Sequence, residues 1–408
     1  MSINKISVSG LGYIGLPTAT MFAHYGAHVI GLDVNQHAIE TINQGKIHIV
    51  EPGLEEIVKK VVESGHLKAS LIAEPADAFL IAVPTPFKGE DYTPDLSYIE
   101  AAVKTIAPVL EKGNVVILES TSPVGATEQM VEWLSTLRTD LTFPRTEHDT
   151  DCDVYVAYCP ERVLPGQVIR ELVENDRTIG GITPESAKKA AEVYAIFVKG
   201  ELVITNARTA EMTKLTENAF RDVNIAFANE LSLIGDRLDI NVWELIELAN
   251  RHPRVNILSP GAGVGGHCIA VDPWFIVNKT PDLAQMVGTA RRVNDNKPKW
   301  VVEKIEQEIE KLGDLGRKPK VALFGLAFKP NIDDLRESPA VEIAQNMGKN
   351  SNIDLLLVEP NIQVLPNKIT QGTLCSLEHA SKEADVIAVL VKHKEFIQLK
   401  NNFMSFVG

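Results

Sequence analysis

The sequence predicts an α/β fold with two doubly wound parallel-sheet domains joined by a long central helix. Short apolar runs alternate with helical stretches through the first half of the chain, which is the pattern of parallel strands connected by helices. The C-terminal third repeats the order of apolar runs found at the N-terminus. Between these parts, residues 209–237 contain no proline and carry apolar residues at helical spacing, so we expect one long helix there.

The first apolar run leads into a glycine fingerprint. Gly10, Gly12 and Gly15 follow the spacing G-x-G-x-x-G before a helical stretch, and the next apolar run ends at Asp33. This is the arrangement of a Rossmann-type dinucleotide site, in which the glycines admit a pyrophosphate to the helix N-terminus and the acidic residue accepts ribose hydroxyls. Because a carboxylate repels a 2′-phosphate, NAD is favoured over NADP. An ordinary glycine turn is the alternative.

Three further apolar runs extend the pattern of the first domain. Residues 78–83, 115–119 and 154–158 are predicted to be parallel strands, and each runs into a loop with polar residues. The three loops are residues 84–86, 120–125 and 159–162. Since ligands bind beyond the carboxyl ends of strands in such sheets, we expect these loops to converge on one cleft.

The C-terminal third is predicted to be a second Rossmann-type unit. Apolar runs at residues 321–325, 354–359 and 384–390 echo the first strands of the chain. This unit lacks the glycine fingerprint, so a pyrophosphate needs side chains there, for which Lys329 and Arg336 are the candidates. A solvated loop whose charges pair with each other is the alternative.

Composition narrows the classes of function. The chain has 408 residues, 45% of them hydrophobic, which allows two or three domains with cores of their own. Its 40 basic and 54 acidic residues leave a net charge of −14, which argues against a nucleic-acid or anionic-membrane partner. We find no secretory or membrane-spanning segment and expect a cytoplasmic protein. The four widely spaced cysteines predict neither a disulfide framework nor a metal site.

Two groups of polar residues are candidates for chemistry. Cys268 follows a run of glycines and precedes Asp272, which favours a nucleophilic thiol that a bulky substrate can approach; a turn before a buried structural cysteine is the alternative. Lys214, Asn218 and Arg221 fall on one face of the long helix, where a lysine and an amide one turn apart can stabilise an oxyanion. A solvated polar stripe is the alternative. The apolar side of this helix is assigned to Leu215, Phe220, Val223 and Phe227.

A thiol together with a hydride acceptor predicts a four-electron oxidation. Oxidation of a primary alcohol gives an aldehyde, which releases its remaining hydrogen as hydride only after a nucleophile has added to the carbonyl. A cysteine can add to give a thiohemiacetal, whose oxidation leaves a thioester that water hydrolyses to a carboxylate. Because an ordinary thiol titrates near about 8.5, Cys268 needs activation, for which Lys214 is the candidate.

These motifs together resemble the UDP-sugar 6-dehydrogenases over nearly the whole chain. The matching segments are the glycine fingerprint and residues 119–125, 159–162, 214–218, 265–272 and 328–336. Within that family, residues 159–166 and 268–275 are similar to the branch that oxidises UDP-N-acetyl-D-mannosamine to its uronate. The UDP-glucose branch has Pro-Lys in place of Ala270 and Val271, and a second glutamate in place of Pro165. The resemblance implies NAD as cofactor, a UDP-sugar substrate, no metal and a role in polysaccharide biosynthesis.

The resemblance also implies roles for individual residues. Those implied to act in catalysis are Cys268 as nucleophile, Lys214 and Asn218 as oxyanion holders, Asp272 with Thr121 to orient the reacting hydroxyl or water, and Glu161 as base for thioester hydrolysis. Those implied to line NAD, besides the glycines, are Tyr13, Ile14, Asp33, Thr85 and Thr121. Those implied to contact the UDP-sugar are Arg162, Val163, Lys214, Asn218, Arg221, His252, Arg254, Gly265, Lys329 and Arg336.

The resemblance further implies a domain plan. Residues 1–205 form the NAD-binding domain, residues 206–310 a central helical, dimerisation and catalytic-loop region, and residues 311–408 the UDP-sugar-binding domain. The family is built around a homodimer through the central helix, and Arg254 acts across that interface. Family members continue into a further strand where this chain ends at residues 402–408, so we expect that strand to be absent and a sheet edge to be uncovered.

Three rival functions stay open. UDP-glucose or another UDP-hexose could be the substrate in the same reaction. A two-electron hydroxyacid dehydrogenase would use Lys214 and Asn218 without the thiol. A catalytically inactive nucleotide-binding or interaction protein would bind NAD and UDP-sugar without turnover.

Overall fold

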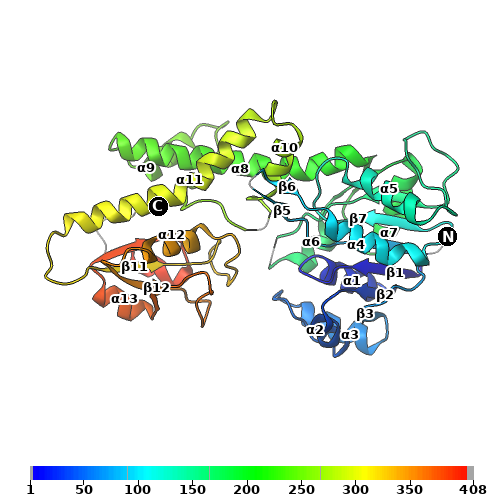
Figure 1. Ribbon diagram of the computed structural model, residues 1–408, viewed down its shortest axis with the longest axis horizontal. Coiled ribbons are helices and arrows are strands. Elements are labelled where there is room, and N and C mark those ends of the chain that lie inside the picture. Colours follow the sequence, from blue (N-terminus) through cyan, green and yellow to red (C-terminus); the bar gives the residue numbers. More distant parts are fainter. Residues whose placement is uncertain (1–2, 90, 165, 267, 402–408) are drawn as a thin grey trace. The chain divides into compact units, whose positions relative to one another are not determined.

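Figure 1 shows the protein as a computed structural model, which describes residues 3–89, 91–164, 166–266 and 268–401. The chain forms two compact units, Met1–Thr216 and Glu217–Gly408. Helix α8 (Ala207–Arg237) begins in the first unit and ends in the second, as the predicted long helix requires. The predicted domain boundaries at residues 205 and 310 stay a prediction. The chain end at residues 402–408, where we expected a strand to be absent, lies outside the described residues.

The first unit is built on an eight-stranded sheet with the order β10-β9-β8-β7-β4-β1-β2-β3. Its strands are β1 (Lys5–Ser9), β2 (His28–Leu32), β3 (Leu67–Ser70), β4 (Ala78–Ile81), β7 (Val115–Leu118), β8 (Tyr155–Tyr158), β9 (Arg177–Gly181) and β10 (Leu202–Asn206). The helices between them are α1 (Gly15–His24), α2 (Gln36–Asn43), α3 (Leu54–Glu63), α4 (Ser97–Ile106), α5 (Ala126–Leu137), α6 (Val168–Glu174) and α7 (Pro184–Tyr194), with a 3-10 turn η1 (Ala107–Val109) after α4. A short antiparallel pair joins β5 (Phe87–Lys88) to β6 (Thr93–Pro94). The predicted α/β class is confirmed.

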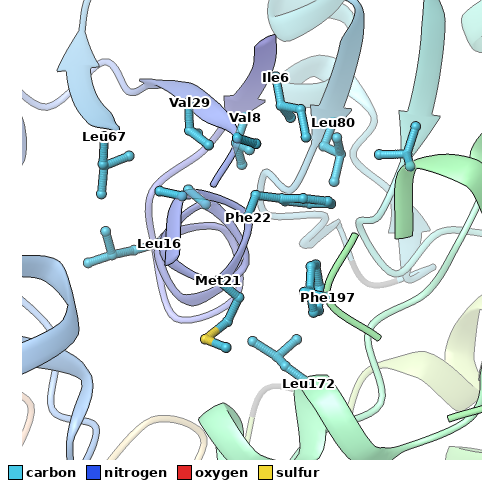
Figure 2. Close-up of a cluster of buried hydrophobic side chains, with 14 of the residues drawn as sticks. Ile6, Val8, Leu16, Met21, Phe22, Val29, Leu67, Leu80, Leu172 and Phe197 are labelled. Atoms are coloured by element: carbon cyan, nitrogen blue, oxygen red, sulfur yellow. The ribbon is translucent and has the colours of Figure 1, made fainter. Parts of the chain in front are cut away.

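Both faces of this sheet are covered, because successive residues of a strand point to opposite sides and both sides are apolar. On β4, Leu80 packs in the cluster around α1 that Figure 2 shows, whereas Phe79 and Ile81 pack in a second cluster with residues of α4 and α5. In the first cluster the rings of Phe22 and Phe197 meet edge to face, with centroids 4.7 Å apart. This burial on both sides explains why the strands appear in the sequence as continuous apolar runs.

The strand order reverses beside β1, which lies between β2 and β4. In doubly wound sheets ligands bind at this switch point. Neighbouring strands run parallel except β8 and β9, which are antiparallel. The sheet is therefore not wholly parallel, contrary to our expectation, and the first residue of β9 lies at the same edge as the end of β8.

The second unit contains a smaller parallel sheet with the order β13-β12-β11-β14. Its strands are β11 (Lys320–Phe324), β12 (Asp354–Val358), β13 (Thr373–Leu374) and β14 (Val386–Val389). The other elements of this unit are α9 (Val242–Ala249), α10 (Asp272–Lys279), α11 (Gln285–Lys311), α12 (Pro339–Gly348), α13 (Leu377–Glu383) and the 3-10 helix η2 (Lys394–Asn401). Strand β11 lies between β12 and β14 as β1 lies between β2 and β4, so the predicted echo between the two ends of the chain is confirmed.

The apolar side predicted for α8 is only partly buried. Leu215 is buried, but Phe220 and Phe227 are 68% and 53% exposed. Part of the buried side of α8 is instead polar: the carboxylate of Asp222 accepts a hydrogen bond of 2.6 Å from Arg291 of α11. Helical periodicity predicted the helix correctly, but it could not show that an ion pair would replace aromatic side chains in the buried contact.

Candidate functional site

The glycine turn after β1 lies at the switch point of the large sheet. Gly10 has a φ of +89°, and a Cβ atom on it would stand 2.6 Å from the carbonyl oxygen of Ala82, so only glycine fits. A Cβ atom on Gly15 would stand 1.7 Å from the carbonyl oxygen of Gly10. Gly12 is exposed, and among the described residues nothing lies within 4 Å of its Cβ position. The first and third glycines therefore allow close packing, and the second leaves space for a ligand.

Asp33 ties this turn to the end of β2. The backbone N–H groups of Leu11 and Asn35 each donate to its carboxylate at 2.8 Å. Each carboxylate oxygen can accept a further hydrogen bond, as a ribose contact requires. Tyr13 and Ile14 lie at the start of α1, which has no acidic side chain in its first turn and no side-chain cap. This helix N-terminus therefore favours an anion, and the residues present fit a dinucleotide.

Hydroxyl groups join the loops after β4 and β7. Thr85 donates a hydrogen bond to the carbonyl oxygen of Thr121, and Ser120 donates to the carbonyl oxygen of Val83 at 2.7 Å. Thr85 is buried and Thr121 is half-buried. Two of the three loops that we expected to converge therefore meet at the carboxyl ends of neighbouring strands.

The third loop, after β8, contacts α8. Lys214 donates from Nζ to the backbone carbonyl oxygen of Glu161 at 2.7 Å. On the same helix, the buried carboxylate of Glu211 accepts from the N–H groups of Gly125 at 2.7 Å and Thr127 at 2.8 Å. Helix α8 is thereby fastened to the loops after both β7 and β8. The sequence reasoning missed Glu211, although its position three residues before Lys214, on the same helix face, was a usable signal.

Three predicted catalytic residues are linked in the second unit. Asn218 of α8 donates from Nδ2 to Oδ2 of Asp272 at 2.5 Å. The N–H of Asp272, the first residue of α10, donates to the carbonyl oxygen of Cys268 at 2.8 Å. Asn218 and Asp272 are buried, whereas Cys268 is exposed. The alternative of a buried structural cysteine is therefore wrong for Cys268.

The glycines before the exposed thiol pack against the loop after β11. A Cβ atom on Gly265 would stand 2.4 Å from the carbonyl oxygen of Glu337 and 2.9 Å from Cβ of Phe328. The N–H of Gly266 donates to the carbonyl oxygen of Arg336 at 3.3 Å. The neighbouring loop fills the space beside Gly265, so this glycine allows the two loops to pack together. The expected approach of a substrate to the sulfur stays a prediction.

Arg336 is paired within its own loop. Its Nε and Nη2 atoms donate to the Asp334 carboxylate at 3.0 and 2.6 Å. This is the internal pairing that we named as the alternative to a ligand contact. The Arg336 side chain is 53% exposed, so its guanidinium group is accessible to a phosphate, which could take the place of Asp334. Lys329 is half-buried in the same loop, and the ligand contacts of both residues stay predictions.

The remaining predicted substrate residues have contacts or exposure of their own. Arg162 donates to the carbonyl oxygen of Asp176 at 3.3 Å, and Val163 packs against the apolar cluster of the first unit. The side chains of Arg221, His252 and Arg254 are exposed. Within the described ranges no hydrogen bond joins these last three residues to the loop that contains Cys268, which we call the thiol loop. Their substrate contacts stay predictions.

Glu359 holds the turn after β11 in the second sheet, which lacks the glycine fingerprint. It follows β12 as Asp33 follows β2, and its carboxylate accepts from the N–H groups of Leu326 at 2.8 Å and Ala327 at 3.0 Å. Its Oε2 also lies 3.0 Å from Nε2 of His393. Burial raises the pKa of Glu359, but the hydrogen bonds from His393 and the backbone lower it to about 2. This carboxylate joins the end of β12 to the turn after β11, as Asp33 joins the end of β2 to the turn after β1.

In the described part of the chain, no group of three or more His, Cys, Asp or Glu side chains is arranged to hold a metal ion. No helix in those residues has both the length and the apolar character to cross a membrane.

Three family models match successive parts of the chain. They are the UDP-glucose/GDP-mannose dehydrogenase family NAD binding domain at residues 4–198, its central domain at residues 208–296, and its UDP binding domain at residues 322–405.

Individual proteins match over almost the same length. A UDP-N-acetyl-D-mannosamine dehydrogenase of Campylobacter jejuni is 62% identical, with 98% of each chain covered. An NDP-N-acetyl-D-galactosaminuronic acid dehydrogenase of Ralstonia nicotianae is 59% identical, with 98% of this chain and 93% of that protein covered. Among solved structures, the UDP-D-ManNAc dehydrogenase of Pyrococcus horikoshii is 42% identical with a TM-score of 0.87, and 96% of this chain and 90% of that chain are covered.

Proposed function

The chain belongs to the UDP-glucose/GDP-mannose dehydrogenase family, and we propose that it oxidises UDP-N-acetyl-D-mannosamine at C6 to UDP-N-acetyl-D-mannosaminuronate through a cysteine thioester. Family membership confirms three predictions made from the sequence: the family itself, an NAD-dependent UDP-sugar dehydrogenase, and NAD as the cofactor. The choice of sugar is supported by the sequence motifs and by the relatives from Campylobacter jejuni and Pyrococcus horikoshii.

The observation that carries the covalent mechanism is the hydrogen-bond chain from Asn218 through Asp272 to the exposed Cys268. A dehydrogenase that stops after one hydride needs no nucleophile. A thiol that is exposed, and whose backbone carbonyl accepts a hydrogen bond from the backbone N–H of the buried Asp272, supports a nucleophile with a defined position.

The residues of the glycine turn are assigned to NAD, which when bound accepts the hydride in each of the two oxidations. Gly12 leaves space at the uncapped N-terminus of α1, and Asp33 retains lone pairs for the ribose. The further side chains assigned to the dinucleotide are Tyr13, Ile14, Thr85 and Thr121.

Four residues of the chain are assigned to the chemistry at C6. The sulfur of Cys268 adds to the aldehyde carbon, and Lys214 and Asn218 stabilise the resulting oxyanion. Loss of a hydride from C6 then leaves a thioester. Glu161 removes a proton from water as the water oxygen attacks C6, the C–S bond breaks, and the thiolate returns to the enzyme. Each sugar therefore gives up two hydrides, consumes one water and becomes a carboxylate.

The residues assigned to the substrate are those that the family resemblance implies. Asp272 and Thr121 orient the reacting hydroxyl group or water. The side chains and backbone assigned to the UDP-sugar are those of Arg162, Val163, Arg221, His252, Arg254, Gly265, Lys329 and Arg336.

Stoichiometry and trapping test this mechanism. The wild-type enzyme is expected to form two NADH per UDP-N-acetyl-D-mannosamine, and mass spectrometry during turnover is expected to find an acyl adduct on Cys268. Cys268→Ser is expected to abolish carboxylate formation, whereas the control Cys375→Ser, a half-buried thiol, is expected to retain it. One NADH per sugar with an aldehyde product, or full turnover by Cys268→Ser, would contradict the thioester route.

The second candidate substrate is another UDP-hexose, and the Ralstonia nicotianae relative favours an N-acetylated one. Turnover of UDP-N-acetylmannosamine, UDP-N-acetylgalactosamine and UDP-glucose, compared side by side at equal concentration, ranks the three sugars. Binding of NAD and UDP-sugar with no absorbance change at the NADH band would instead support an inactive binding protein.

We also propose that the chain forms a homodimer through α8. Phe220, Phe227 and Ile234 recur at seven-residue intervals and are 68%, 53% and 46% exposed. An apolar stripe of this kind on a helix supports an interface with a second protein surface. Light scattering is expected to give twice the chain mass, and Phe227→Glu is expected to give the monomer. An unchanged dimer in that variant would locate the interface elsewhere.

A further inference from the structure

A buried cluster of charged and titratable side chains lies at one edge of the large sheet. Glu119 follows β7, Arg177 begins β9 and Tyr194 ends α7, and all three are buried. Nη1 of Arg177 lies 3.4 Å from Oε1 of Glu119, and the Tyr194 hydroxyl donates to the same oxygen at 3.1 Å. The guanidinium carbon lies 4.8 Å from the centre of the Tyr194 ring. None of these residues has a role in the reaction proposed above.

The topology brings Glu161 to this cluster. Strands β7 and β8 pair in parallel, so Glu119 and the loop that contains Glu161 leave the sheet at the same edge. Strand β9 runs antiparallel to β8, which places Arg177 at that edge as well. The charge of Glu161 acts on both Glu119 and Arg177.

The charges of two buried carboxyl groups therefore act on one arginine, and Glu119 is the one in contact with it. Oε2 of Glu119 and Oε1 of Glu161 are buried, and neither has a hydrogen-bond partner within the described residues. A buried charge is costly unless it is paired, so the cluster favours a state in which one carboxyl group is neutral.

The group that changes its charge near neutral pH is Glu119. Burial raises its pKa to about 7, while Arg177 acts to lower this value and Glu161 to raise it. Burial also raises the pKa of Cys159 to about 11 and raises the pKa of Tyr194, so these two neighbours stay neutral. The cluster is thus a carboxyl group that titrates beside the proposed base.

We propose that Glu119 is a positioning residue for Glu161, because the ionisation of its carboxyl group decides whether Arg177 balances one buried carboxylate or two. This inference rests on the proposed role of Glu161 in thioester hydrolysis. While Glu119 is neutral, the positive charge of Arg177 is balanced by Glu161 alone. When Glu119 releases its proton to solvent, Arg177 is shared between two carboxylates and the cluster becomes more negative, which favours proton transfer from the attacking water, and hydrolysis accelerates.

Infrared difference spectroscopy on the enzyme without substrate tests the coupling directly. The carbonyl band of the neutral Glu119 carboxyl group is expected to disappear with a midpoint near pH 7 and to be missing in Glu119→Gln. Coupling between two groups is reciprocal, so Glu161→Gln is expected to lower this midpoint by about one pH unit. The control Cys159→Ala, in the same cluster but without a change of charge, is expected to leave the midpoint where it is.

The rate of thioester hydrolysis in a single turnover tests the consequence. In the wild type it is expected to rise about fivefold between pH 6 and pH 8, which is the part of a tenfold change, or one pKa unit of coupling, that falls in this window when the midpoint is near pH 7. Glu119→Gln imitates the neutral carboxyl group and keeps an acceptor for Tyr194, so it is expected to come close to the wild type at pH 6 and to be about tenfold slower at pH 8. If this variant does not fold, Tyr194→Phe provides the test, because it removes the hydrogen-bond donor to Glu119. It is expected to move both the infrared midpoint and the pH at which the hydrolysis rate rises to higher values.

The two measurements separate the inference from the mechanism beneath it. An infrared midpoint that does not respond to Glu161→Gln overturns the inference, even if two NADH per sugar still form. A midpoint that moves, together with a wild-type rate profile in Glu119→Gln, shows that the coupled group is not the hydrolytic base. That result overturns both the positioning role and the assignment of Glu161.

Discussion

The contact between the thiol loop and the loop after β11 predicts the cost of one added methyl group. In Gly265→Ala, the new Cβ atom would stand 2.4 Å from the Glu337 carbonyl oxygen, 2.8 Å from Cδ of Pro339 and 2.9 Å from Cβ of Phe328. Two of these neighbours are a backbone atom and a proline ring, which cannot rotate away. Overpacking of this kind costs about 1–3 kcal/mol.

This cost is expected to appear in both stability and turnover. For a unit of this size, about 1–3 kcal/mol corresponds to a fall in melting temperature of roughly 2–12 °C. The loop must shift three residues before Cys268, and a displacement of about 1 Å at a reacting group can lower kcat about 100-fold. Differential scanning calorimetry and NADH production measure the two effects.

Gly261→Ala is the matched control, because it adds the same atom to the same loop. Its Cβ atom would meet nothing closer than the carbonyl oxygen of Gly263 at 3.9 Å, which is an ordinary contact. We expect this variant to keep wild-type turnover and to gain up to about 1 kcal/mol from the reduced freedom of its unfolded chain. If Gly265→Ala equals Gly261→Ala in melting temperature and in kcat, the steric reasoning is refuted.

Three further predictions concern a thiol, a pH dependence and a cofactor contact. Iodoacetamide at neutral pH is expected to label Cys268 before Cys159, because Cys268 is exposed whereas burial raises the pKa of Cys159 to about 11; peptide mass spectrometry reads the order. Glu359→Gln is expected to lower the free energy of unfolding by about 1–3 kcal/mol at pH 7, measured by urea denaturation. Because the pKa of Glu359 is lowered from 4.5 to about 2, its stabilising effect is present above pH 4.5 and is lost as the pH falls toward 2, so the gap between variant and wild type narrows over that window. Asp33→Ala is expected to weaken NAD binding about 10- to 100-fold in calorimetric titration. The variant loses both the acceptor for the ribose hydroxyls and the hydrogen bond from the N–H of Leu11.

Each of these predictions has an internal control. Cys375, half-buried with a raised pKa, is expected to react after Cys268, and prior labelling of Cys159 would contradict the assignment of the exposed thiol. Glu378→Gln alters an exposed pair with Lys382 and is expected to change stability by less than about 0.5 kcal/mol at any pH. For Asp33→Ala, the control is the affinity for the UDP-sugar, which is expected to stay at the wild-type value.

Most of the secondary structure could be predicted from local patterns. The strands at residues 78–83 and 115–119 were visible because both faces of the sheet are covered, which makes them continuous apolar runs. The long helix was visible from its periodicity and the absence of proline. The direction of β9 was not predictable in this way, because parallel and antiparallel partners use the same apolar pattern.

The candidate site was predictable in its parts but not in its contacts. Glycine spacing indicated the dinucleotide turn, and the linkage of Asn218, Asp272 and Cys268 joins residues chosen from the sequence. For Arg336 the sequence allowed both a phosphate contact and pairing within its own loop. The structure shows the pair with Asp334, and the phosphate contact stays a prediction.

The sequence by itself determined the fold class, the glycine turn, the long helix and the thiol, because each depends on residues close together along the chain. Only the tertiary structure decided which carboxylates are buried and what they face. Glu119 meets Arg177 across 58 positions of sequence, and Glu359 meets His393 across 34. Such pairs depend on strand order and on the direction of neighbouring strands, and burial then sets their pKa values. These properties arise from the packing of distant segments, which no local pattern encodes.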